Sequence, residues 1–179
     1  MSRWSRDELE AAFAHYTSEV REASANNDWG RFADLFTEDA SYDEHLYGEF
    51  HGREEIRAWI IKTMTTMPGC WMPDYPSSWY VIDEERGRIV CEILNRMQDP
   101  GDGSIHEAAN ITILTYAGDH LFSKEEDVYN PAKFTKVIIE WARVAHAHGT
   151  LMDEGAAWMD AALPGWRQGE SATPSRQTS

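Results

Sequence analysis

The segment "NNDWGRFADLFTEDASYDEHLYGEFHGREEIRAWI", residues 26–60, decides the fold because the spacing of its apolar side chains changes twice. The first part has helical spacing after a cap at Asn27 or Asp28, and the last part has helical spacing again after Gly52. Between them, polar and apolar side chains alternate as they do in strands. We therefore expect a short helix, a short strand pair and a longer helix, in this order.

The flanking sequence predicts one helix before this segment and a sheet after it. Residues 6–25 carry apolar side chains every three or four positions, which is typical of an amphipathic helix, and Tyr16 lies on the apolar stripe. After Pro76, turn sequences separate alternating runs that predict four consecutive antiparallel strands. These runs are residues 78–84, 88–98, 104–116 and 120–129. A closing helix is expected over residues 130–149, so the order of elements predicts an α+β fold.

Length and composition indicate one domain. The chain has 179 residues, of which 42% are hydrophobic, and this is enough for a single core over residues 1–166. Residues 167–179 contain few apolar side chains, which predicts a disordered tail.

The charge of the chain limits its partners. A net charge of −15 opposes binding to nucleic acid and to anionic membranes, so we expect neither partner. The N-terminus lacks the hydrophobic segment of a secretion signal, which favours a cytoplasmic location. The His and acidic residues show no convincing ligand spacing, so we expect no metal and no cofactor.

Residues 26–60, together with "LTYAGDHLFSKEEDVYNPAKF" near the end, resemble the SnoaL-like families of the nuclear-transport-factor-2-like superfamily. The similarity covers about residues 8–145. It implies a conical half-barrel with helices packed in the concave face of a strongly bent, mainly antiparallel sheet. It also implies a deep, mostly apolar pocket and often a dimer. Members include ketosteroid isomerases, epoxide hydrolases, polyketide cyclases, dehydratases and non-enzymatic modules, so the resemblance does not choose one activity.

The strand "ASYDEHL" puts Tyr42 and Glu44 on one face, because successive side chains alternate across a strand. The resemblance to ketosteroid isomerases implies that Glu44 is a general base and that Tyr16 donates a hydrogen bond to an enolate. The resemblance to limonene epoxide hydrolases implies a pocket carboxylate at Asp127, although Gln98 stands where that family's Asp-Arg-Asp network needs a second acid. We expect Glu44, Asp127 and Tyr16 to be catalytic, with Glu44 slightly favoured as the base.

Further residues are expected to bind the substrate because they are aromatic or polar side chains on the strands, the helices or the connecting loop around the pocket. They are Tyr42, Trp59, Trp71, Asn95, Asn110, Thr112 and Tyr129. Trp71 lies in a connection that three prolines stiffen, which favours a place at the pocket entrance.

Two carboxylates in an apolar pocket favour proton transfer, because desolvation and mutual repulsion raise the pKa of at least one towards neutrality. We therefore expect a cofactor-independent isomerase, dehydratase or cyclase for a hydrophobic polyketide-, steroid- or isoprenoid-like molecule. The alternative is a non-catalytic small-molecule-binding or dimerisation module. The outer sheet face is expected to carry Ile111 and Ile113. We expect a homodimer in which this face is paired and shielded from solvent.

Overall fold

The computed structural model describes residues 3–168. The elements follow in this order: α1 (Arg6–Asn26), the 3₁₀ helix η1 (Trp29–Leu35), β1 (Phe36–Glu44), β2 (Gly48–His51), α2 (Arg53–Thr65), the 3₁₀ helix η2 (Gly69–Trp71), β3 (Ser77–Asp83), β4 (Arg88–Arg96), β5 (Glu107–Gly118), β6 (Leu121–Val128), α3 (Pro131–Ala147) and α4 (Asp153–Ala162). Residues 169–179 of the predicted tail lie outside the described part, so their disorder stays a prediction.

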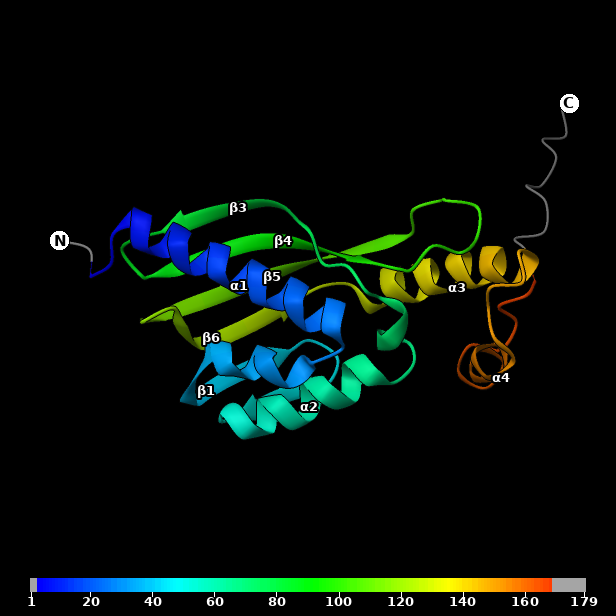
Figure 1. Ribbon diagram of the computed structural model, residues 1–179, viewed down its shortest axis with the longest axis horizontal. Coiled ribbons are helices and arrows are strands. Elements are labelled where there is room, and N and C mark those ends of the chain that lie inside the picture. The colour runs from blue at the N-terminus through cyan, green and yellow to red at the C-terminus, as the bar shows by residue number, and fades with distance from the viewer. Residues whose placement is uncertain (1–2, 169–179) are drawn as a thin grey trace, which may run out of the picture.

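The six strands form one curved sheet that is not closed into a barrel, in the order β2-β1-β6-β5-β4-β3. The neighbouring strands are antiparallel except β1 and β6, which are parallel. In Figure 1, α1 and α2 lie on the same side of the sheet, while α3 and α4 lie beyond the ends of the strands. The predicted α+β fold with a mainly antiparallel sheet is confirmed.

Local sequence explains the two helices that cover the sheet. Ser5 caps α1 by accepting a hydrogen bond from the Glu8 backbone N–H at 3.2 Å, and Asn27 ends this helix in the left-handed conformation. Glu54 and Glu55 stand in the first turn of α2, where negative charge stabilises the helix. The apolar stripes of both helices pack on the sheet and form the main core with η1.

The strand predicted at residues 104–116 begins later than expected, at Glu107. Residues 99–104 instead form a turn in which Asp99 accepts hydrogen bonds from the Gly101 and Gly103 N–H groups, at 2.7 and 3.0 Å. Aspartate side chains commonly compete in this way with a strand ladder. His106 therefore lies before the strand, and it contacts Ser104 at 3.0 Å.

A second core lies under α3 and α4, separate from the one between α1, α2 and the sheet. Its centre is Trp141, which is fully buried, donates a hydrogen bond from its indole N–H to the Gln98 carbonyl at 2.8 Å and lies 4.9 Å from the ring of Trp71. Met159 of α4 and Trp166 complete this cluster. The C-terminal helices thus pack on each other and on η2.

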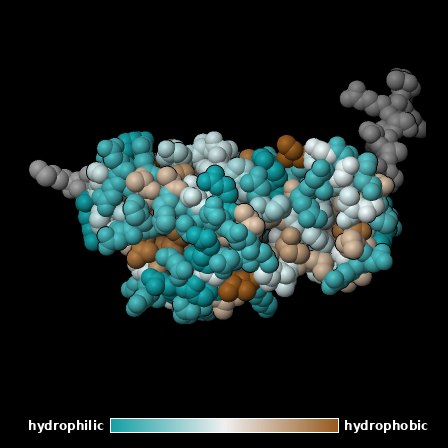
Figure 2. Space-filling view, viewed as in Figure 1, coloured by the Kyte–Doolittle hydropathy of each residue, from teal (hydrophilic) through white to brown (hydrophobic). Residues whose placement is uncertain are grey.

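Figure 2, viewed from the side of α1 and α2, shows a mainly hydrophilic surface on which hydrophobic side chains appear in small separate areas. This agrees with the net charge of −15. No helix in residues 3–168 is both long and apolar enough to cross a membrane.

Candidate active site

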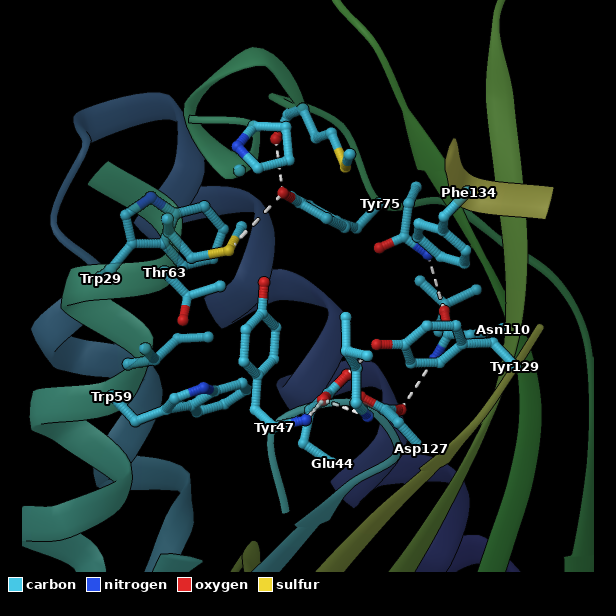
Figure 3. A pocket seen from close by; sticks show the side chains of 18 of the residues that line it. Trp29, Glu44, Tyr47, Trp59, Thr63, Tyr75, Asn110, Asp127, Tyr129 and Phe134 are labelled. Carbon is cyan, nitrogen blue, oxygen red and sulfur yellow. Dashed lines mark hydrogen bonds between the residues drawn. The ribbon is translucent and has the colours of Figure 1, made fainter. Parts of the chain in front are cut away.

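A cavity of about 480 Å³ opens between the helices and the concave face of the sheet. Side chains from α1, η1, α2, the 66–75 connection, β1, β4, β5, β6, α3 and α4 line it, and most of the lining is apolar. Figure 3 shows that its polar groups gather at one end, around Glu44, Asp127 and Asn110, while Tyr75 stands at the other end. The cavity has the size and polarity of a small-molecule site.

Strand pairing brings three acidic side chains to the polar end. Residues Tyr42 and Glu44 of β1 are buried and face the cavity, whereas Asp43 and His45 point away and are more exposed. Tyr42 pairs with Glu125 of the parallel neighbour β6, and alternation then places Asp127 on the same face. The predicted orientation of Tyr42 and Glu44 is confirmed.

Asp127 is partly exposed to the cavity and is held by three donors. Its Oδ1 accepts hydrogen bonds from the Thr112 hydroxyl at 2.6 Å and the Asn110 amide at 2.7 Å. Its Oδ2 accepts from the Tyr42 hydroxyl at 2.6 Å. Burial raises the pKa of Asp127 to about 6, the negative charge of Glu44 adds to the rise, and the hydrogen bonds oppose it.

Glu125 lies behind Asp127 and is only 2% exposed. Its Oε1 accepts a hydrogen bond from the Tyr16 hydroxyl at 2.9 Å, and the Tyr42 hydroxyl oxygen lies 3.1 Å from the same atom. Its Oε2 is buried and has no hydrogen-bond partner among residues 3–168. Burial, and then the negative charge of Asp127, raises the pKa of Glu125 well above its usual range. The sequence reasoning did not include Glu125 among the site residues.

Glu44 accepts three hydrogen bonds that hold a turn. Its Oε2 accepts from the backbone N–H groups of Leu46 and Tyr47, at 2.8 and 2.6 Å, and its Oε1 accepts from the Tyr129 hydroxyl. These contacts fix the turn between β1 and β2. In Figure 3 the Tyr47 ring stands in the cavity between Trp59 and Tyr129. Sequence reasoning missed Tyr47, because turn residues have no alternation that predicts their direction.

The remaining predicted residues divide into those that line the cavity and one that does not. Tyr16 lines it but is almost fully buried, and its hydroxyl is used by Glu125. Asn95 donates from its amide to the Asn110 side-chain oxygen at 2.7 Å, which extends the polar network. Trp59 of α2 lines the cavity on the side away from Asn110 (Figure 3), and its ring centroid lies 4.6 Å from that of Tyr42.

Trp71 is the exception, because it lies in the second core and not in the cavity lining. Its ring packs between Trp141 and Trp158, at 4.9 and 5.5 Å. The prediction that Trp71 stands at the pocket entrance is therefore wrong. The neighbouring Met72 lines the cavity instead.

The C-terminal helices contribute a wall that the sequence reasoning did not predict. Phe134 and Ile138 from α3, Trp158 from α4 and Leu163 after it all line the cavity. Phe134 packs on Tyr129, with 4.6 Å between the ring centroids, so this wall adjoins the polar groups. Within residues 3–168, no group of three His, Cys, Asp or Glu residues is placed to hold a metal ion.

Residues 17–72 match the family described as the SnoaL-like domain. No curated protein sequence is significantly similar to this chain. Several solved structures are similar to it at low sequence identity. A putative isomerase from Bacillus subtilis is 11% identical, with a TM-score of 0.57, over 73% of this chain and 92% of that one.

Two further structures have the same fold. A LEH-like epoxide hydrolase from M. tuberculosis is 8% identical, with a TM-score of 0.55, over 74% of this chain and 93% of that one. An NTF2-like protein of unknown function from Burkholderia pseudomallei is 16% identical, with a TM-score of 0.52, over 70% of this chain and 96% of that one. These identities show a shared fold alone. The resemblance predicted from the sequence is thus confirmed: residues 17–72 match the SnoaL-like domain, and the chain has the fold of nuclear-transport-factor-2-like structures.

Proposed function

We propose that the cavity is an acid–base active site that moves a proton next to a carbonyl group of a hydrophobic substrate. One observation carries this proposal: Asp127 is open to an apolar cavity and has a pKa of about 6. A carboxyl that titrates near neutral pH accepts and returns a proton efficiently under physiological conditions. The reaction is an isomerisation, a dehydration or a cyclisation, and it needs no cofactor.

We assign the base to Asp127 rather than to Glu44. Both carboxylates accept three hydrogen bonds, but two of those on Glu44 come from backbone N–H groups of its own turn. Moving Glu44 towards a substrate would break the turn that carries Tyr47. Asp127 instead binds the side chains of Thr112, Asn110 and Tyr42, which hold its carboxylate at the cavity surface.

We assign the carbonyl-binding donor to Tyr47 rather than to Tyr16. The Tyr16 hydroxyl already donates to Glu125, and Tyr16 is only 5% exposed. The Tyr47 ring stands inside the cavity and its backbone N–H is held by Glu44 (Figure 3). Tyr47 is 56% exposed, so its hydroxyl is accessible to a ligand, and a positioned hydroxyl donor stabilises a developing enolate. Glu44 and Tyr129 are then positioning residues for this turn.

The shape of the cavity supports a bulky apolar substrate. Its volume of about 480 Å³ and its mostly apolar walls suit a fused-ring or isoprenoid-like molecule with one polar end. The polar end would bind beside Asp127 and the apolar end against the apolar lining. Epoxide hydrolysis is less well supported, because Arg96 pairs with Asp74 and Glu107, at 3.0 and 2.9 Å, instead of with a cavity carboxylate.

The proposal is tested with decalone, an apolar bicyclic ketone, in heavy water. Proton NMR would follow the replacement of the hydrogens next to its carbonyl by deuterium. The expected result is exchange well above the buffer rate that depends on protein concentration. If decalone binds, as shown by changes in protein NMR signals, but does not exchange faster than in buffer, the cavity is a binding module and the enzymatic proposal is wrong.

We also propose that the outer sheet face forms a homodimer. Strand pairing sets Val81, Val90 and Ile113 side by side on this face, and Val81 is 56% exposed in the isolated chain. An apolar row of this kind is typical of a surface that another protein surface covers.

Val81→Lys is expected to convert a dimer to a monomer, with a dissociation constant raised about 100-fold, because a charge would lose its hydration in an apolar interface. Analytical ultracentrifugation measures the change. The control is Met152→Lys, since Met152 is 76% exposed and lies at the start of α4, beyond the strands. A wild-type protein that sediments as a monomer at micromolar concentration contradicts the proposal.

A further inference from the structure

The Tyr42 hydroxyl stands between two buried carboxyl groups. Its oxygen lies 2.6 Å from Oδ2 of Asp127 and 3.1 Å from Oε1 of Glu125. A tyrosine hydroxyl has one proton, so it can donate to only one of these oxygens. The other contact needs a proton from the carboxyl group itself. Two ionised carboxylates would leave an anionic oxygen against a hydroxyl lone pair, inside a site with little water to screen the repulsion.

The number of donors on each carboxyl decides where the extra proton lies. Asp127 accepts from Thr112 and Asn110 as well as from Tyr42, and these three donors stabilise a negative charge. Glu125 is 2% exposed, and one of its two oxygens has no partner among residues 3–168. A buried carboxylate with an unpartnered oxygen costs more free energy than a neutral carboxylic acid at the same place, because the cost of burying the charge is added to that of burying a polar atom.

We propose that Glu125 is a neutral carboxylic acid that stores a proton for Asp127 and passes it through the Tyr42 hydroxyl. The hydrogen bonds then run in one direction, from Tyr16 to Glu125, from Glu125 to Tyr42 and from Tyr42 to Asp127. A chain of this kind is polarised towards its last acceptor, the carboxylate of Asp127. The pair of carboxyl groups holds one proton and one negative charge.

Proton transfer from Glu125 to Asp127 conserves the number of protons and the total charge of the three side chains. Glu125 gives its proton to the Tyr42 oxygen, and Tyr42 gives its own proton to Oδ2 of Asp127. Glu125 becomes the carboxylate and Asp127 becomes the acid, while Tyr42 is again neutral. This proton store rests on the proposed function, because a dehydration or an isomerisation needs Asp127 both as a base and as an acid.

The groups that face the pair agree with this assignment. They are Tyr16 from α1, Tyr42 and Glu44 from β1, Cys91 from β4 and Tyr129 after β6. Burial and the charge of Asp127 both raise the pKa of Glu125, which is the direction that a stored proton requires.

Carbon-13 NMR of labelled Asp and Glu carboxyl carbons tests the proposal without any substrate. The Glu125 signal is expected to keep the chemical shift of a carboxylic acid at neutral pH. The Asp127 signal is expected to titrate with a pKa of about 6. Glu125→Gln replaces one neutral group by another, so the midpoint of Asp127 is expected to stay unchanged. If Glu125 were ionised, this substitution would remove a neighbouring negative charge and lower the midpoint by about 1–3 units.

Two further variants complete the design. Glu126→Gln is the matched control, because Glu126 lies on the outer side of β6 and pairs with Lys124 at 3.1 Å. It is expected to leave both signals unchanged. Tyr42→Phe removes a donor from Asp127 and breaks the relay, so the Asp127 midpoint is expected to rise. A Glu125 signal that titrates together with the exposed glutamates, or a lower Asp127 midpoint in Glu125→Gln, overturns the proposal. These titrations need no substrate. Their failure would therefore contradict the proton store alone, whereas a failed decalone experiment would contradict the proposed function.

Discussion

Asp127→Asn is expected to lower the protein-dependent exchange of decalone hydrogens by about 10²–10⁴-fold, which is the usual contribution of a positioned acid or base. Asparagine keeps the size of the side chain but cannot accept a proton from carbon. The affinity for decalone is expected to change little, because the apolar walls of the cavity are unaltered. Exchange followed by proton NMR and binding followed by protein NMR measure the two effects separately.

Glu44→Gln distinguishes the two candidate bases. If Glu44 only holds the turn that carries Tyr47, this variant is expected to weaken decalone binding and to leave part of the exchange. Glu126→Gln, on the outer side of the same strand as Asp127, is expected to leave both unchanged. Full exchange in Asp127→Asn together with loss of exchange in Glu44→Gln would assign the base to Glu44. Full exchange in both variants would contradict proton transfer by either carboxylate.

Trp141→Ala is expected to lower the free energy of unfolding by about 3–5 kcal/mol, because it opens a cavity in the centre of the second core. Trp141 is fully buried, packs on Trp71 and donates a hydrogen bond to the Gln98 carbonyl. Ile138, one turn earlier on α3, lines the ligand cavity, so the same variant is expected to weaken ligand binding. Urea unfolding measures the stability.

Trp141→Phe is the matched control for this variant. Phenylalanine keeps much of the aromatic packing and loses the indole hydrogen bond, so a smaller loss is expected, of which the hydrogen bond accounts for about 1 kcal/mol. Met152→Ala, at a site that is 76% exposed, is expected to leave stability unchanged. A loss in Trp141→Ala no larger than that in Trp141→Phe would show that α3 is not anchored by this side chain.

Alternation along strands accounts for the part of the site that could be predicted from the sequence. In β1 it puts Tyr42 and Glu44 on one face, and in β6 it puts Glu125 and Asp127 on one face, where the structure has them. A strand has only two faces, so once a strand is assigned correctly, the only open question is which of its two faces lies towards the cavity. The assignments of β4 and β5 similarly bring Asn95, Asn110 and Thr112 into the cavity.

The features that the sequence reasoning missed depend on contacts between distant segments. Trp71 lies in the second core because Trp141, seventy positions later, offers it an aromatic partner, and no local spacing encodes that contact. The direction of Tyr47 depends on hydrogen bonds between its turn and Glu44. The importance of Glu125 depends on hydroxyl groups from α1 and β1, whose distances only the folded chain defines.

The pH dependence of decalone exchange by the wild-type protein tests the central claim, that Asp127 is the base, most directly. Asp127 must be deprotonated to accept a proton, and its deprotonated fraction grows as the pH rises through its pKa. The protein-dependent rate is therefore expected to rise as the pH passes through about 6 and to level off above it. A protein-dependent rate that stays constant through this range, or that falls as the pH rises, would contradict the account.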